Sequence, residues 1–263
     1  MYKLSVVLIF SLVFPMSLFA QVANVNLPDI IKICESYKNN INDVNIEYSF
    51  EMIEPESQMK CVGAQKGHFV GIKPFEKFYK SILLFITEDD KGNRRGHQVN
   101  VASDGNTYIS SDDASDKIKT FDRFEMTPLC LTLFNPNEYN SALLNASKNK
   151  STYNFVFDPN IIKVNDFNSV EVDCIHASDY SAPRFKVAFS VDHNYTIVRY
   201  IINVSESKIA KYDILQLKDL ENGIWFPVKG VYEFSGTGFK KNFTVENVWI
   251  NQGLTGKNLI NTD

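Results

Sequence analysis

The sequence predicts an α+β protein dominated by one antiparallel β-sheet, with helices gathered on its concave face. Segment 185–234 contains runs rich in Val, Ile, Tyr and Phe, separated by short turn sequences. These turns are Asp192-His193-Asn194, Ser205-Glu206-Ser207 and Glu221-Asn222-Gly223. Strands joined so closely form a continuous curved sheet, whose concave side must be covered by apolar groups. Helical periodicity is confined to two other regions, which are expected to supply that cover.

Residues 1–20 have the pattern of a secretory signal peptide. Lys3 precedes an apolar run, 4–14, that is shorter than the ~20 residues a membrane-spanning helix needs. The small residue Ala20 occupies the position at which a signal peptidase cuts. We therefore expect cleavage after Ala20. The mature chain, 21–263, is expected to form one domain, because no Pro-, Ser- or charge-rich linker divides it.

The charge of the chain is modest and mixed in sign. Its formal net charge is −4 at pH 7, with no long run of one sign. The densest basic group, Lys91, Arg94 and Arg95, is offset by the acidic residues 88–90, which is typical of a solvated turn. Binding to nucleic acid needs Lys and Arg clustered on one face, so we expect no nucleic-acid partner.

Four cysteines follow the predicted cleavage site. They are Cys34, Cys61, Cys130 and Cys174. Their spacing contains no CxxC pair and no nearby histidine that would complete a zinc set. In an exported chain they form one or two disulfides or remain buried thiols, and four cysteines allow three pairings. The sequence leaves this choice open.

The mature chain begins with an expected helix and a strand. Pro28 suits a first helical turn, and apolar residues at helical spacing predict an amphipathic helix over 28–40. Segment 44–52 then alternates strictly between apolar and polar residues, which predicts a half-buried strand. Its apolar face consists of Val44, Ile46, Tyr48, Phe50 and Met52.

Further strands and a helical insert are expected in order along the chain. The next strand ends near Pro74, and the strand 77–87 that follows is apolar on both faces. The Asp104-Gly105 pair predicts a hairpin. Its strands are 98–103 and 107–110, and later strands are expected at 154–158, 161–164, 169–176 and 242–251. Segment 127–146 contains Pro128 and Pro136 as helix-start signals and predicts two short helices covering the sheet.

No sequence motif indicates a metal, a cofactor or a catalytic group. Asp112, Asp113 and Asp116 lack the ligand order of a calcium loop. The histidines, His68, His97, His176 and His193, are scattered, and none lies in HExxH or beside GxSxG. We therefore expect no enzyme activity, metal or cofactor. A hydrolase would require a histidine and an acid to converge in one cleft.

The candidate ligand-binding residues form a predicted apolar cavity wall. The wall comprises Ile46, Tyr48, Phe50 and Met52, together with Phe78, Ile82, Leu84 and Ile86 of the strand 77–87. Trp225 is predicted at the mouth of the hollow, since an aromatic ring with one polar atom suits a boundary with water. Each buried methylene of an acyl chain is worth ~0.8 kcal/mol. The alternative is an ordinary closed core, because large apolar residues on a sheet face are usually buried.

The order of motifs over 28–251 is distinctive. A helix and an alternating strand are followed by SDGNTY, the mid-chain insert, VEVDCIHA, VDHNYTIVRYI, LKDLENGIWFPVKGVYEF and FTVENVWIN. This order resembles the LolA-like family of periplasmic lipoprotein carriers. The resemblance implies an unclosed barrel, whose helix-lidded hollow accepts the acyl chains of lipoproteins. The family's functional arginine matches no arginine of this chain by motif.

The resemblance implies a periplasmic carrier or binding protein, expected to be a monomer. Its ligand would be lipoprotein acyl chains or another apolar molecule, and its partners would be inner- and outer-membrane sorting proteins. The alternative is a secreted scaffold or interaction protein of the same fold with a packed core and no ligand, because a fold does not fix a function.

Overall fold

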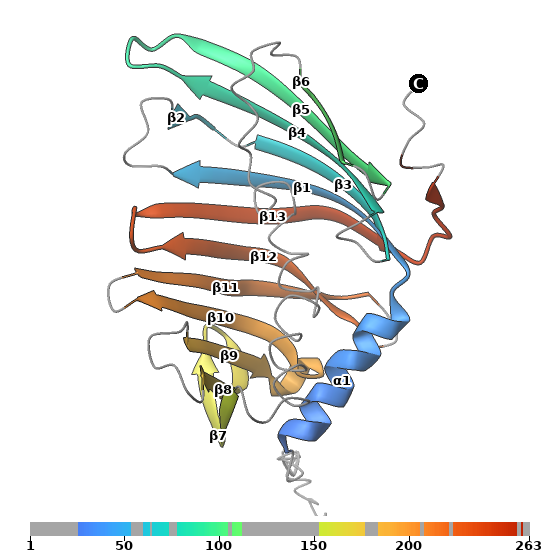
Figure 1. Cartoon of the computed structure of the whole chain (residues 1–263), viewed down its shortest axis with the longest axis vertical. Coiled ribbons are helices and arrows are strands. Elements are labelled where there is room, and N and C mark those ends of the chain that lie inside the picture. Colours follow the sequence, from blue (N-terminus) through green and yellow to red (C-terminus); the bar gives the residue numbers. More distant parts are fainter. Residues whose placement is uncertain are drawn as a thin grey trace, which may run out of the picture.

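The computed structural model describes residues 26–53, 60–63, 65–73, 78–104, 107–111, 153–176, 184–205, 208–220, 223–256 and 259. These residues form one α-helix, α1 (Leu27–Asn40), a short 3-10 helix, η2 (Val191–His193), and thirteen strands (Figure 1). The strands are β1 (Asp43–Ile53), β2 (Lys60–Cys61), β3 (Gln65–Ile72), β4 (Phe78–Glu88), β5 (Arg94–Asp104), β6 (Thr107–Ser111), β7 (Tyr153–Val164), β8 (Phe167–His176), β9 (Arg184–Ser190), β10 (Thr196–Ser205), β11 (Lys208–Asp219), β12 (Trp225–Phe234) and β13 (Phe239–Ile250).

Helix α1 ends where the sequence predicts and begins one residue earlier, at Leu27. Asn26 caps it by accepting a hydrogen bond from the Asp29 backbone N–H at 3.1 Å, with Pro28 in the first turn. The helix buries Ile30 completely in the main core. Ile33 and Leu220 pack against a smaller cluster formed by Ile41 and Ile224. No helix in the described part of the chain is both long and apolar enough to cross a membrane.

All thirteen described strands belong to one antiparallel sheet. Its order is β6-β5-β4-β3-β1-β13-β12-β11-β10-β9-β8-β7, with the two-residue β2 pairing with the end of β4. The first and last long strands, β1 and β13, lie side by side in the middle (Figure 1). The path has two different ends, β6 and β7, so the described sheet is open rather than a closed barrel.

The predicted single antiparallel sheet is confirmed, but its predicted helical cover is not shown. The described part of the chain is mostly β, with α1 as its single α-helix. The two helices expected within 127–146 lie outside the described residues. The predicted strands 154–158 and 161–164 are one strand, β7, which continues through an irregularity between Asp158 and Ile162. The short strand β2 was not predicted, because two residues carry no periodic pattern.

The strand registers divide the side chains of the sheet between two faces, because residues that pair across a ladder project to the same side. On the face that we call the apolar face, Tyr48 and Phe50 of β1 pair with Val245 and Phe243 of β13. On the opposite face, which we call the polar face, Glu47 accepts a hydrogen bond from the Asn247 amide at 2.8 Å. The sequence alternation in β1 therefore corresponds directly to the two faces.

Two glycines allow aromatic rings to lie flat on the apolar face. A Cβ atom at Gly67 would lie 2.1 Å from the Tyr48 ring. A Cβ atom at Gly230 would lie 2.6 Å from the Phe243 ring and 2.7 Å from the Asp213 carbonyl oxygen. A ring covering a strand glycine shields the backbone that the missing side chain exposes. These contacts explain why the two strands carry glycine on their buried side.

Candidate functional site

A row of aromatic side chains crosses the apolar face from β9 to β13. The row consists of Phe185, Tyr200, Tyr212, Tyr232 and Phe239. Successive ring centroids are 5.9, 6.2, 4.5 and 5.8 Å apart, within the range of favourable aromatic contacts. Each ring comes from a different strand, so the register of the meander assembles the row. We call this set the aromatic row.

The tyrosines of the aromatic row combine apolar rings with neutral hydroxyls. Tyr200 and Tyr212 are only 2% and 4% exposed. Burial raises the pKa of the Tyr232 phenol above its ordinary value, so this hydroxyl stays protonated at neutral pH. The row therefore offers apolar surface with uncharged hydrogen-bonding groups, which suits a ligand that is mostly hydrocarbon.

Two polar side chains interrupt the apolar face beside Phe50. The Lys241 side chain is buried, and its Nζ lies 4.6 Å from the centroid of the Phe50 ring. Gln65 pairs with Phe50 across β3 and β1 and is also buried. Neither was singled out from the sequence, because a lone Lys or Gln in a strand usually faces water. The sequence did contain a signal for Lys241. It lies two residues before Phe243, so alternation along the strand places both side chains on the same face.

The wall residues predicted in β1 share one face. Ile46, Tyr48 and Phe50 lie on the apolar face and are 0%, 3% and 4% exposed. Met52 lies on the same face, pairs with Lys241, and is half-buried. The structure thus brings these four predicted residues together beside the aromatic row, without testing whether they contact a ligand.

The wall residues predicted in β4 lie on the other face. Phe69 of β3, on the apolar face, pairs with Ser81, so the apolar face of β4 carries Leu83. Phe78, Ile82 and Leu84 therefore project to the polar face, as does Ile86. Grouping these residues with Ile46 in one wall was wrong.

Both sides of β4 carry apolar residues. The sequence pattern therefore did not show which of its side chains project to the apolar face of the sheet. Leu84 and Ile86 are 43% and 45% exposed, whereas Leu83 is 3% exposed. Lys80, the charged residue in the interior of this strand, lies on the polar face with them. Its position was the sequence signal that could have set the alternation correctly, because a lysine is almost never fully buried.

Trp225 lies in a cluster at the end of the sheet beside η2. Its ring meets the His193 ring edge to face at 4.5 Å, and His193 meets Phe167 in the same way at 5.3 Å. Burial lowers the pKa of His193, against the opposing effect of the Asp192 carboxylate. The placement of Trp225 at the mouth of a hollow stays a prediction.

His68, His97 and His193 form hydrogen bonds on separate elements. His68 bonds to Asn45 and His97 to Thr87, each at 2.8 Å. His193 Nδ1 lies 2.7 Å from Ser190 Oγ, but Ser190 is fully buried and this pair closes the turn into β10. A nucleophile needs access to its substrate, so this geometry serves the turn rather than a hydrolase site.

Cys174 is a buried thiol on the apolar face. It is not in a disulfide, and burial, with the neighbouring Asp173 carboxylate, raises its pKa to about 12. Cys61 is not in a disulfide either. A chain with two disulfides is therefore excluded, and a bridge between Cys34 and Cys130 stays a prediction. Among the residues that the structure describes, no three His, Cys, Asp or Glu side chains come together in a way that could hold a metal ion.

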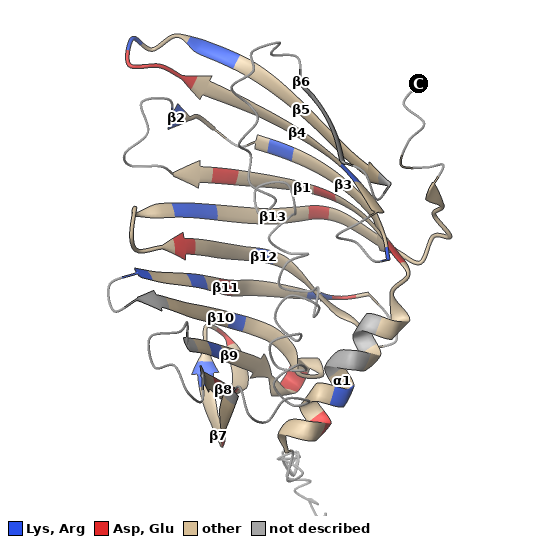
Figure 2. Cartoon of the chain, viewed as in Figure 1, with Lys and Arg blue, Asp and Glu red and all other residues tan. Residues whose placement is uncertain are grey.

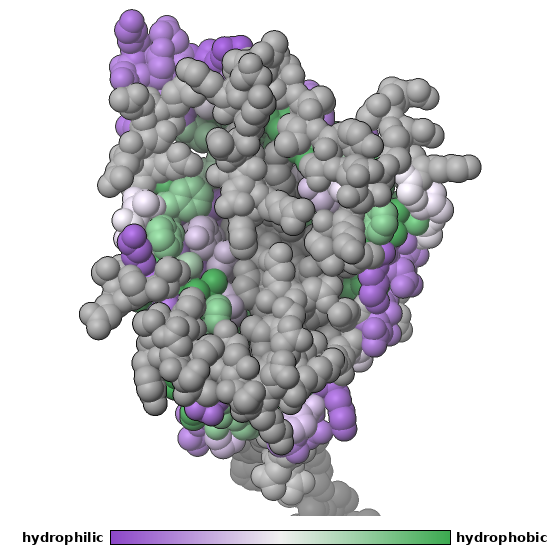
Figure 3. All heavy atoms as spheres, viewed as in Figure 1, coloured by the Kyte–Doolittle hydropathy of each residue, from purple (hydrophilic) through white to green (hydrophobic). Residues whose placement is uncertain are grey.

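The polar face carries paired charges of both signs. Across neighbouring strands, Lys186 pairs with Glu171 at 3.5 Å, Arg199 with Asp213 at 2.6 Å and Lys240 with Glu233 at 2.9 Å. Within β11, Lys211 pairs with Asp213 at 2.5 Å. Figure 2 marks basic segments on β9, β10, β11 and β13 and an acidic segment on β12. The predicted solvated turn between β4 and β5 is confirmed, with Asp89 accepting two backbone N–H bonds, and it forms a hydrophilic projection in Figure 3.

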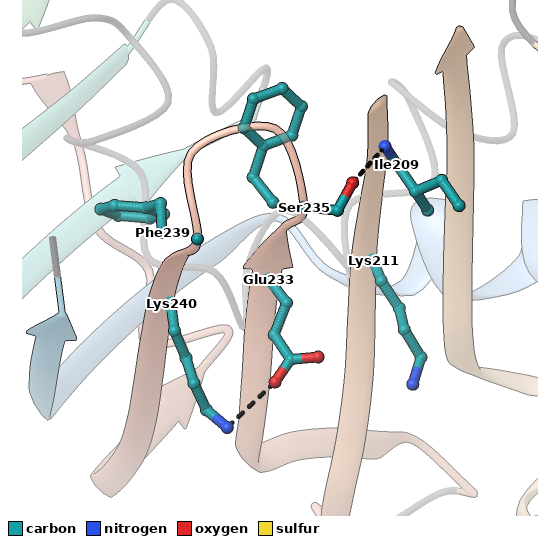
Figure 4. Close-up of a pocket in the computed structure, with 8 residues that line it drawn as sticks. Ile209, Lys211, Glu233, Ser235, Phe239 and Lys240 are labelled. Atoms are coloured by element: carbon teal, nitrogen blue, oxygen red, sulfur yellow. Dashed lines mark hydrogen bonds and ion pairs between the residues drawn. The ribbon is translucent and has the colours of Figure 1, made fainter. Parts of the chain in front are cut away.

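A pocket of about 390 Å³ lies where β11, β12 and β13 meet the β12–β13 turn (Figure 4). Its lining includes Ile209 and Phe239 together with the charged residues Lys211, Glu233 and Lys240. Ser235 closes one side by accepting a hydrogen bond from the Ile209 backbone at 2.9 Å. The volume suits a small molecule, but the charged lining distinguishes this pocket from the apolar hollow expected from the sequence.

Comparison with solved structures identifies the class of fold. A DUF1329 family protein from Desulfovibrio piger superposes with a TM-score of 0.51 at 10% sequence identity, covering 89% of this chain and 96% of the other. A domain named for outer membrane lipoprotein sorting, from Vibrio parahaemolyticus, superposes with a TM-score of 0.51 at 9% identity, covering 89% and 97%. The sequence matches no protein-family model and no curated protein.

The predicted resemblance to lipoprotein-sorting proteins is confirmed as a likeness of fold. A LolA superfamily protein from Nitrosomonas europaea also superposes, with a TM-score of 0.47 at 8% identity over 90% of this chain. Identities this low leave the side chains that line the apolar face specific to this protein. A shared fold does not fix a function, which depends on those side chains.

Proposed function

We propose that this protein is an exported periplasmic carrier that shelters lipoprotein acyl chains, or another apolar ligand, against the apolar face of its sheet. The observation that carries the proposal is the aromatic row, which extends the apolar surface of β1 and β13 across the meander. The fold likeness to a lipoprotein-sorting domain supports it. Export rests on the predicted signal peptide, 1–20, and the predicted helical cover belongs to the same proposal.

Burial of hydrocarbon supplies the binding energy in this proposal. A C16 acyl chain has about fifteen carbons beyond its carboxyl, each worth ~0.8 kcal/mol when fully buried. Partial burial along the aromatic row is thus sufficient for micromolar binding, which requires ~8 kcal/mol. The carrier would act as a monomer that receives its ligand at the inner membrane and releases it at the outer membrane.

A second candidate is the scaffold or interaction protein with a packed core. The observation that favours it is the burial of the apolar face in this structure, where Phe69, Phe226 and Val44 are at most 1% exposed. A protein of this kind would use its outer surface and take up no apolar ligand. The two candidates therefore differ in whether the protein takes up an apolar ligand.

The test uses the mature chain and the neutral fluorescent probe 1-N-phenylnaphthylamine. The carrier proposal expects saturable fluorescence enhancement with a micromolar Kd, and release of an acylated lipoprotein from membrane vesicles into the soluble fraction. Absence of both uptake and release from a chain with native circular dichroism would contradict the carrier and favour the scaffold.

A further inference from the structure

The apolar face contains a small polar site around the Phe50 ring. Lys241 approaches the ring from β13, is 5% exposed, and holds its Nζ 4.6 Å from the ring centroid. Gln65 flanks Phe50 from β3 and is 1% exposed. Both registers put these side chains on the same face as Phe50. A cation and an amide are therefore placed on either side of one aromatic ring.

The hydrogen-bonding capacity of Gln65 is only partly used. Its Nε2 donates to the Gly63 carbonyl oxygen at 3.1 Å, which fixes the orientation of the amide. Its Oε1 is buried and accepts no hydrogen bond within the described part of the chain. A buried carbonyl oxygen without a donor is destabilising, so such a group in a native protein calls for an explanation. A ligand N–H or O–H would provide the missing donor.

The ammonium of Lys241 supplies the complementary chemistry. It carries three N–H donors and a positive charge, held in position by the face of the Phe50 ring. Tyr232, whose phenol stays protonated, is its ladder partner in β12 and links this site to the aromatic row.

We propose that Lys241 and Gln65 bind the polar head of an acyl ligand whose chain lies along the aromatic row. Lys241 donates to an anionic carboxylate or phosphate oxygen of the head, and Gln65 Oε1 accepts from an N–H or O–H of the same head. This inference rests on the proposed function and adds a ligand class to it. The ligand is an anionic amphiphile rather than a neutral hydrocarbon.

The test compares two fluorescent probes with the same hydrocarbon chain, cis-parinaric acid and cis-parinaryl alcohol. Wild type is expected to bind the acid at least about tenfold more tightly than the alcohol, the factor that one charge-assisted hydrogen bond supplies. Lys241→Met is expected to remove this preference while keeping alcohol binding. The matched control is Lys240→Met, because Lys240 lies one residue away on the polar face, paired with Glu233.

Each outcome of this comparison is decisive. Equal affinity of wild type for acid and alcohol, or the same loss for both probes in Lys241→Met, overturns the inference and leaves the carrier function standing. Failure of wild type to bind either probe or 1-N-phenylnaphthylamine overturns the carrier function itself. If Lys241→Met loses its native circular dichroism, Gln65→Leu replaces it; this variant is expected to weaken binding of the alcohol, whose O–H can donate to Gln65 Oε1, more than binding of the ionised acid, which has no donor, and an equal effect on both probes overturns the inference. Displacement by oleate or by monooleoyl phosphatidic acid then distinguishes a carboxylate from a phosphate head.

Discussion

The two faces of this sheet differ in kind although they share every strand. On the apolar face, aromatic rings from neighbouring strands touch one another and lie flat over Gly67 and Gly230. On the polar face, Lys and Arg pair with Asp and Glu across the same ladders. One face is therefore suited to hydrocarbon and the other to water. The alternation of a strand, two residues per repeat, is what separates them.

The polar face is not polar over its whole area. Strand β4 places Ile82, Leu84 and Ile86 among the charges, with Leu84 and Ile86 more than 40% exposed. Single exposed apolar residues are common on protein surfaces and carry no functional meaning by themselves. The site of interest is accordingly the apolar face, and substitutions of adjacent residues on opposite faces test this distinction directly.

The largest expected effect compares Phe50 with Glu51. Phe50→Ala removes a ring that is 4% exposed and packs on Tyr48, so we expect the free energy of unfolding to fall by about 3–5 kcal/mol. Glu51 is exposed, and Glu51→Ala is expected to change it by less than about 0.5 kcal/mol. Urea unfolding followed by circular dichroism measures both. Similar losses in the two variants would mean that β1 does not divide into a buried and an exposed side.

The next comparison tests the corrected alternation of β4. Leu83→Ala is expected to cost about 2–5 kcal/mol, because Leu83 is 3% exposed. Leu84→Ala is expected to cost well under 1 kcal/mol, because its side chain is 43% exposed. The same chemical change at consecutive positions isolates the effect of the face. A larger loss at Leu84 than at Leu83 would restore the alternation first predicted from the sequence.

A smaller effect is expected from filling the glycine under Phe243. Gly230→Ala puts a Cβ atom 2.7 Å from the Asp213 carbonyl oxygen, so we expect a loss of about 1–3 kcal/mol from overpacking. Gly96, on the polar face, has open space where its Cβ atom would lie. Gly96→Ala is therefore expected to be neutral within about 0.5 kcal/mol. Thermal unfolding midpoints that fall equally in both variants would contradict the proposed ring contact.

The smallest effect depends on pH and concerns Cys174. Its pKa is raised from 9.0 to about 12 in the folded chain, so the unfolded thiol ionises first as the pH rises. The contribution of the neutral Cys174 thiol to the free energy of unfolding is complete below about pH 9 and is lost as the pH rises toward 12. Between pH 7 and pH 10, wild type should lose about 1.4 kcal/mol more than Cys174→Ala. Parallel losses in urea titrations under reducing conditions would show that the thiol is accessible.

The fold was largely predictable because its pattern is local. The period of β1, the turns around Asn194 and Gly223, and the Asn26-Leu27-Pro28 helix start each depend on a few adjacent residues. The candidate site was predictable only where one strand alternates cleanly, as at Ile46, Tyr48 and Phe50. The pairing of Phe50 with Gln65 and its contact with Lys241 depend on ladder registers between distant segments.

The measurement that tests the central claim most directly is photo-crosslinking with a fatty acid that carries a diazirine near the end of its chain. The probe is bound to the mature protein and irradiated, and modified residues are located by mass spectrometry. The account predicts adducts on the apolar face, at Tyr48, Phe50, Tyr232 or Phe243, that unlabelled fatty acid suppresses. Adducts at Leu84 and Ile86, or adducts that competitor does not suppress, would contradict it.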